Sequence, residues 1–107
     1  EIQYTARAGE ALVTAFGTPE GKAFGLLVGA PAAIGVVMAD TAVKSANVDV
    51  VDYQSPSSSD MSNEVVLLIS GDSGAVKQAV KAARDVGLAL LETMGERPKN
   101  KGNAYII

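Results

Sequence analysis

The 107-residue sequence contains no cysteine, no histidine and no tryptophan. Without cysteine there are no disulfides, no thiolate nucleophiles and no cysteine-ligated zinc sites. Without histidine there is no imidazole acid or base, no Ser-His-Asp system and no histidine metal site. Carboxylates, lysines, hydroxyls and backbone amides are the groups left for chemistry. We therefore expect no catalytic site of these kinds and no resident metal or cofactor.

Aromatic residues are also scarce, at 5% of the chain. Small residues take their place, with 17 alanines, 13 valines and 11 glycines. Small side chains let helices pack closely on a sheet, but ligand pockets are usually lined by larger apolar and aromatic side chains. The composition therefore favours a structural or assembly role over a small-molecule site.

The net charge and the short apolar runs argue against nucleic-acid-binding and membrane proteins. A net charge of −3 argues against a nucleic-acid partner or an anionic membrane surface. The longest apolar stretch, from Ala30 to Ala39, is interrupted by Pro31 and Gly35 and is shorter than the ~20 residues of a membrane helix. No signal peptide is recognisable at the N-terminus. We expect a soluble, cytosolic chain with one domain over residues 1–107.

Hydrophobic periodicity and turn residues predict the order strand, short helix, strand, helix, strand, strand, helix. The predicted strands span 2–6, 22–29, 48–53 and 64–70, the predicted helices span 9–16, 32–46 and 75–94, and 105–107 is a candidate last strand. The inner face of the second helix is predicted to comprise Ile34, Val37, Met38 and Ala42. If the first strand is moved to the end, the order becomes β-α-β-β-α-β. We therefore predict an α+β sandwich, a circularly permuted split βαβ (ferredoxin-like) fold with a mainly antiparallel sheet and helices on one face.

Two glycine-containing segments invite comparison with phosphate sites. The segment from Gly17 to Ala23 is one residue short of a P-loop, ends in a residue without a hydroxyl and precedes a strand, so it fails the motif. The segment from Ser70 to Ser73 lies between a strand and a helix, where backbone amides can hold an anion. Because Asp72 would repel an anion, Asp72 or Ser73 is predicted to cap the helix instead.

Acidic residues surround a serine-rich loop at 54–62. Asp49 and Asp52 are predicted on opposite faces of a strand, so they are not expected to form a carboxylate pair. Asp60 and Glu64 complete the group, and their spacing does not match a calcium-binding loop. A solvated loop rim is the expectation.

Two segments resemble the hallmark motifs of the bacterial microcompartment (BMC) shell domain. Asp40–Val48 resembles the A-D-x-x-x-K-x-A-N-V helix end of that family, and Ser70–Val80 resembles its R-G-D-x-G-A-V-x-x-A-V segment, with Ser70 in place of the usual arginine. The resemblance covers about residues 22–94. The leading strand and helix resemble those of permuted members, most of all the second half of tandem shell proteins of the propanediol- and ethanol-utilisation type. The chain would then be either a stand-alone domain or one half of a tandem protein.

The resemblance implies a hexagonal tile, hexameric or trimeric and pseudo-hexameric, that packs edge to edge with other shell proteins and has no enzymatic activity. Its location would be the shell of a bacterial microcompartment in the cytoplasm. Lys44 and Asn47 would lie at the tile edge. The loop at 54–61 would line a central pore for small polar metabolites. The pore-lining candidates are Ser55, Ser57, Ser58, Ser59 and Asp60.

The residues alone also allow other interpretations. Lys44 can be an ordinary i, i+4 ion-pair partner of Asp40. The same fold can carry a small ligand-binding or regulatory domain, and fold alone does not exclude catalysis. An enzyme would need a convergent polar pocket, which the sequence does not indicate.

Overall fold

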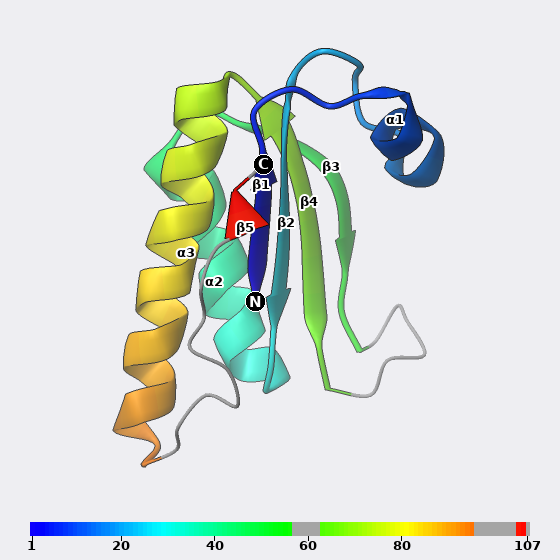
Figure 1. Ribbon diagram of the computed structural model, residues 1–107. Coiled ribbons are helices and arrows are strands. Elements are labelled where there is room, and N and C mark those ends of the chain that lie inside the picture. The colour runs from blue at the N-terminus through cyan, green and yellow to red at the C-terminus, as the bar shows by residue number, and fades with distance from the viewer. Residues whose placement is uncertain (57–62, 96–104, 107) are drawn as a thin grey trace.

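The computed structural model describes residues 1–56, 63–95 and 105–106. Within them, five strands form one sheet in the order β3-β4-β2-β1-β5 (Figure 1). The strands are β1 (Ile2–Thr5), β2 (Ala23–Gly29), β3 (Asp49–Gln54), β4 (Val65–Gly71) and β5 (Tyr105–Ile106). The helices are α1 (Glu10–Phe16), α2 (Ala32–Ser45) and α3 (Ser73–Thr93).

The strand order confirms the permuted ferredoxin-like topology. The pairs β1–β2, β2–β4 and β3–β4 are antiparallel, and the short β5 runs parallel to β1. Because β1 lies beside β2, it takes the place that the last strand has in the unpermuted β-α-β-β-α-β order. Moving one strand from the end of the chain to its start therefore leaves the sheet intact.

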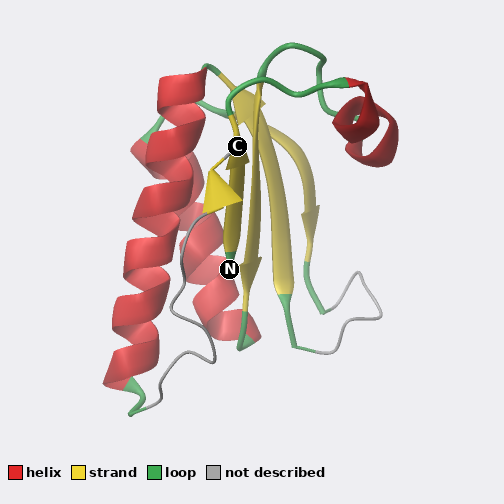
Figure 2. Ribbon diagram, in the orientation of Figure 1, coloured by secondary structure: helices red, strands yellow, loops and turns green. Residues whose placement is uncertain are grey.

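The main core lies between the sheet and the two long helices, which cover the same face (Figure 2). Alternation along β4 turns Val65, Leu67 and Ile69 towards α2 and α3, and all three are almost fully buried. From α3, Val76 and Val80 complete the centre of this layer. The small-residue composition thus produces a close helix-on-sheet sandwich.

The backbones of α2 and β2 approach each other closely at two glycines. A Cβ atom placed on Gly29 would lie 2.5 Å from the Cα of Gly35, and a Cβ on Gly35 would lie 2.7 Å from the carbonyl oxygen of Gly29. Met38 fills the space beside this contact, because its sulfur would lie 2.9 Å from a Cβ on Gly29 and 2.7 Å from one on Gly87. The flexible side chain of Met38 therefore fills the space where α2, α3 and β2 meet.

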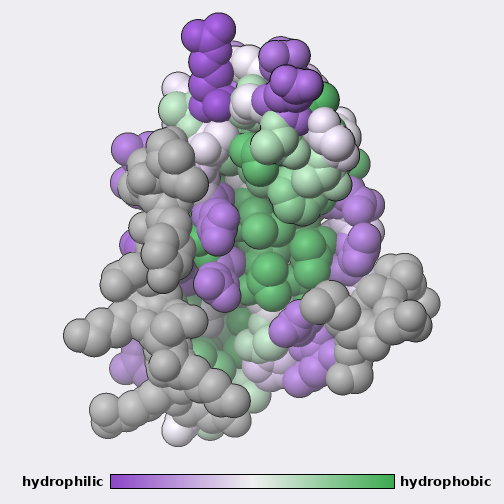
Figure 3. Space-filling model, turned by 45° about the vertical axis from the view of Figure 1, so that its right-hand side comes forward, coloured by the Kyte–Doolittle hydropathy of each residue, from purple (hydrophilic) through white to green (hydrophobic). Residues whose placement is uncertain are grey.

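The short helix α1 packs on the face of the sheet opposite to α2 and α3. Leu12 packs with Ala8, Phe24 and Leu68, and the strand positions of Phe24 and Leu68 face away from α2 and α3. Phe16 stacks on Phe24 with ring centroids 5.2 Å apart. Below α1, hydrophobic residues gather on the open face of the sheet (Figure 3).

Local differences from the predicted elements are small. The prediction of Val37 on the inner face of α2 was wrong, because Val37 is 40% exposed and the buried positions are Ile34, Gly35, Met38, Ala39 and Ala42. Since α2 packs against both α3 and the sheet, small Gly35 and Ala39 take inward positions that a larger residue would not fit. No helix among the described residues is long and apolar enough to cross a membrane.

Candidate functional site

The predicted tile-edge residues lie together at the exposed C-terminal end of α2. Lys44 donates to Asp40 across 2.9 Å, and the side chains of the two residues are 74% and 56% exposed, respectively. Asn47 follows the helix and is also exposed. Lys44 therefore forms the intrachain ion pair with Asp40 that its i, i+4 spacing allows. Its ammonium group is exposed enough to contact a further partner.

Two side-chain hydrogen bonds hold the C-terminal end of α2 in place. Gln78 of α3 donates its side-chain amide to the carbonyl oxygen of Ser45 at 2.7 Å, and the Ser45 hydroxyl donates to the Ala42 carbonyl at 3.1 Å. These bonds satisfy carbonyls that have no partner inside the helix. Sequence reasoning missed Gln78, since a glutamine on a polar helix stripe carries no sign of its distant partner.

The predicted pore loop joins β3 to β4 at the end of the sheet where α2 begins (Figure 1). Ser55 is half-buried. The predictions for Ser57, Ser58, Ser59 and Asp60 lie outside the described residues. On the returning side of the loop, the side-chain oxygen of Asn63 accepts a 3.3 Å hydrogen bond from the backbone amide of Ala32. This bond ties the hairpin to the first turn of α2, a contact with no local sequence signal.

The segment from Ser70 to Ser73 turns the chain from β4 into α3. Asp72 occupies the N-cap position, its carbonyl accepts the first helical hydrogen bond from Val76 at 3.0 Å, and Ser73 begins the helix. Asp72 is thus at the predicted cap position, but its side chain makes no capping hydrogen bond, and the turn is held by the backbone. Gly71 has a φ of +154°, which a residue with a side chain rarely adopts.

Ser70, which replaces the arginine of the resembled motif, faces away from the long helices. It is 1% exposed, and its hydroxyl has no hydrogen-bond partner among the described residues. Its neighbours in the sheet are Phe24 on β2 and Asp49 on β3.

The prediction that Asp49 and Asp52 face opposite sides of the sheet was wrong. Asp49 pairs with Ser70 and Asp52 pairs with Leu68, with a register shift between Val50 and Asp52. Because Ser70 and Leu68 are two residues apart on β4, their partners share one face. The extra residue at the bulge thus reverses the alternation, and both carboxylates are exposed on the edge strand.

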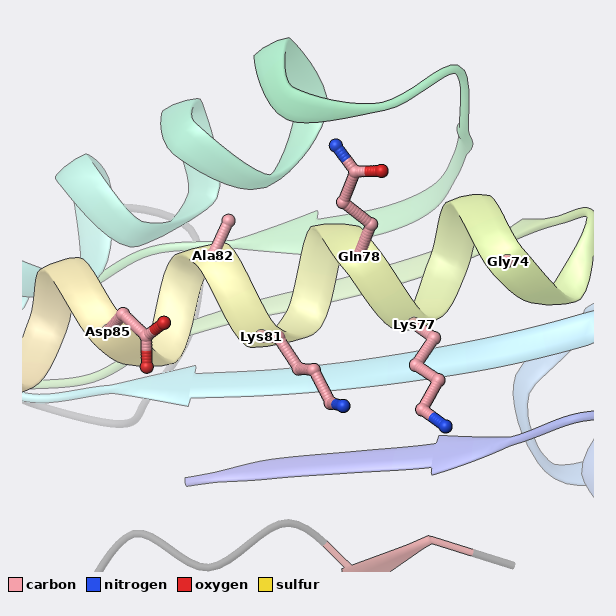
Figure 4. Close-up of a pocket in the computed structure, with 6 residues that line it drawn as sticks. All are labelled: Gly74, Lys77, Gln78, Lys81, Ala82 and Asp85. Carbon is pink, nitrogen blue, oxygen red and sulfur yellow. The ribbon is translucent and has the colours of Figure 1, made fainter.

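A shallow groove of about 450 Å³ runs along α3. Its lining comes from that helix alone: Gly74, Lys77, Gln78, Lys81, Ala82 and Asp85 (Figure 4). Lys77 and Lys81 extend to one side of the helix, whereas Gln78 points towards α2. Among the described residues, no group of three or more acidic side chains is placed to hold a metal ion.

Comparison with known proteins decides the family, because residues 23–96 match the BMC domain. The chain belongs to the BMC-domain family. The match includes both segments that carried the resemblance, and it extends from β2 through α3. The leading β1 and α1 lie outside it, as expected for a permuted member.

Relatives of this BMC domain include the bacterial microcompartment shell protein PduB of Salmonella typhimurium, 60% identical over 107 residues. The alignment covers 99% of this chain and 40% of that protein. PduB of Limosilactobacillus reuteri is 53% identical, with 99% of this chain and 45% of the relative covered. The chain therefore spans less than half the length of these relatives. They are named as shell proteins rather than enzymes, in agreement with the sequence-based prediction.

Solved structures give the same result for the BMC fold. A trimeric microcompartment shell protein PduB superposes with a TM-score of 0.87 at 53% identity, over 99% of this chain and 47% of that chain. EtuB from Clostridium kluyveri superposes with a TM-score of 0.89 at 46% identity, over 97% and 46%. A flat hexamer of CutR shares the fold at 19% identity, with a TM-score of 0.68 over 99% of this chain and 86% of its own.

Proposed function

We propose that this chain is a structural tile of a bacterial microcompartment shell. The observation that carries the proposal is 60% identity to a named shell protein over almost the whole chain, joined to the BMC-domain match. The composition supports it, since small core residues make a thin sandwich of the sheet and the two long helices. The α3 groove is open and lined by one helix, so a small ligand-binding domain has less support.

The tile would be a ring of six BMC domains, formed either by six chains or by three chains with two domains each. The trimeric PduB structure supports the second form, because this chain covers 47% of it and each chain has room for two such domains. Light scattering of the full-length protein in solution should give the mass of six domains. A monodisperse monomer at high protein concentration would contradict the ring.

The exposed end of α2 would lie at the edge of this ring and meet other shell proteins there. Lys44 and Asn47 lie at a helix end that Gln78 of α3 ties down by a hydrogen bond to Ser45. A lysine held on a rigid helix loses less conformational freedom on binding than one on a loop. Self-association through this edge would extend single rings into a layer.

The loop from Ser55 to Asp60 would line a pore at the ring centre. Serine hydroxyls donate and accept hydrogen bonds, so they can replace part of the hydration of a small polar metabolite such as a diol. The tie from Asn63 to Ala32 would anchor one side of the opening.

Replacing Ser57, Ser58 and Ser59 with leucine should slow the passage of a small diol through assembled shells and leave the ring mass unchanged. The physical reason is that leucine narrows the opening and removes the hydroxyls that replace hydration. Flux can be followed with a diol-consuming enzyme enclosed in the shells. An assembled structure with residues 55–60 on the outer perimeter, away from every symmetry axis, would refute the pore assignment.

A further inference from the structure

The C-terminal end of α2 is capped by side chains rather than by a left-handed residue. Ala46 follows the helix in an extended conformation, with a φ of −157° and a ψ of 160°. Many helices end instead in a residue of positive φ, which lets backbone amides bond the last free carbonyls. At α2, the Ser45 hydroxyl bonds the Ala42 carbonyl and the Gln78 side chain bonds the Ser45 carbonyl. Because Ser45 belongs to α2 itself, Gln78 is the cap that ties this end to another element.

The chain just beyond the helix is held by packing. A Cβ atom placed on Gly71 would lie 3.6 Å from the carbonyl oxygen of Asn47 and 3.7 Å from the Cα of Val48. Ala46 and Val48 also pack against the main core. In the last turn of α2, by contrast, Lys44 has a side chain that is 74% exposed. The bond from Gln78 therefore acts on the part of this end that core packing holds least.

Gln78 itself is placed outside the core. It is exposed on α3, and its side chain points towards α2, whereas Lys77 and Lys81 extend to another side of the helix (Figure 4). Its 2.7 Å bond reaches a carbonyl 33 residues away in the chain. A substitution at this position removes the bond without opening a cavity. The effect of Gln78 on the helix end can therefore be separated from the stability of the fold.

We propose that Gln78 is a positioning residue for the tile edge. By bonding the Ser45 carbonyl, it keeps the last turn of α2 closed and holds Lys44 in the geometry that meets a neighbouring tile. Association costs less free energy when the groups that make the contact are already ordered. Gln78 acts through Ser45 and makes no contact with the neighbouring tile itself. The inference rests on the proposed edge and names the residue that prepares it.

Two variants of the full-length protein test the hydrogen bond. Gln78→Met keeps the length of the side chain and removes the donor. Gln78→Lys restores a donor, and a cation is favourable at the C-terminal end of a helix. The protein concentration at which sheets appear should rise about fivefold or more in Gln78→Met, the effect of losing one hydrogen bond. Gln78→Lys should form sheets close to the parent concentration, and both variants should keep the ring mass in light scattering.

Hydrogen exchange gives a readout that does not depend on sheets. It is measured by mass spectrometry on rings below the concentration at which sheets form. Peptides that cover residues 40–48 should exchange several-fold faster in Gln78→Met, because the last turn of α2 opens more often. Peptides from the centre of α3 should exchange as in the parent. Gln3→Met is the matched control, since Gln3 is exposed on β1 and faces the side of the sheet opposite to α2.

The outcomes separate this inference from the proposed edge. If Gln78→Met forms sheets at the parent concentration, Gln78 does not position the edge, and the edge proposal stands. The same conclusion follows if exchange at residues 40–48 is unchanged, or if Gln78→Lys loses sheets as fully as Gln78→Met. If the parent protein forms rings and never forms sheets, the proposed edge fails and the inference fails with it.

Discussion

Gly35→Ala is expected to destabilise the domain by roughly 2–3 kcal/mol. The new Cβ would lie 2.7 Å from the Gly29 carbonyl oxygen and 2.7 Å from the Cβ of Val65. Both neighbours belong to central strands, so neither can move without shifting the sheet. Alanine gains about 1 kcal/mol over glycine in a helix, but the overlap costs more than this gain. Urea denaturation of the parent and the variant measures the difference.

Gly74→Ala is the matched control, because it makes the same change where a Cβ would meet nothing within 4 Å. It should leave stability unchanged or raise it by up to about 1 kcal/mol. Gly87→Ala should fall between the two, since its Cβ would meet the sulfur of Met38, the far part of a flexible side chain. Equal stability of the parent and Gly35→Ala would show that α2 and β2 are not in backbone contact.

Lys44→Glu is expected to abolish the growth of tiles into sheets while rings remain. The Lys44 side chain is 74% exposed, and its ion pair with Asp40 contributes only about 0.3–0.5 kcal/mol to the fold. The reversed charge would place two acidic groups on a helix end that should meet a neighbouring tile. Electron microscopy counts sheets against single rings, and light scattering confirms that the ring mass is unchanged.

Asp40→Ala separates the two roles of Lys44. It removes the intrachain partner and leaves the ammonium group in place. If Lys44 acts at the tile edge, Asp40→Ala should still form sheets and Lys44→Glu should not. Equal sheet formation by Lys44→Glu and the parent protein would reduce Lys44 to a surface ion-pair partner.

The elements of this fold could be predicted from the sequence because its helices and strands carry clear apolar periods. The strand run of β4 and the long stripe of α3 are placed to within two residues. The permuted topology was predicted from the element order, because moving the first strand to the end gives the β-α-β-β-α-β order of the split βαβ fold.

The features that could not be predicted from the sequence depend on interactions between distant segments of the chain. The bulge near Val51 shows no glycine or proline, so strict alternation placed Asp49 and Asp52 on opposite faces. Gln78 and Asn63 find partners about thirty residues away, at Ser45 and Ala32, and no spacing rule connects such positions. Helix periodicity likewise placed Val37 inward, although the packing of α2 on two neighbours selects Gly35 and Ala39 instead.

Negative-stain electron microscopy of the full-length protein that carries this sequence tests the tile most directly. A ring of six BMC domains should give projections with six similar lobes around a centre, and hexagonal sheets of these units at high protein concentration. Particles of the size of one domain, with no larger species at any concentration, would contradict it.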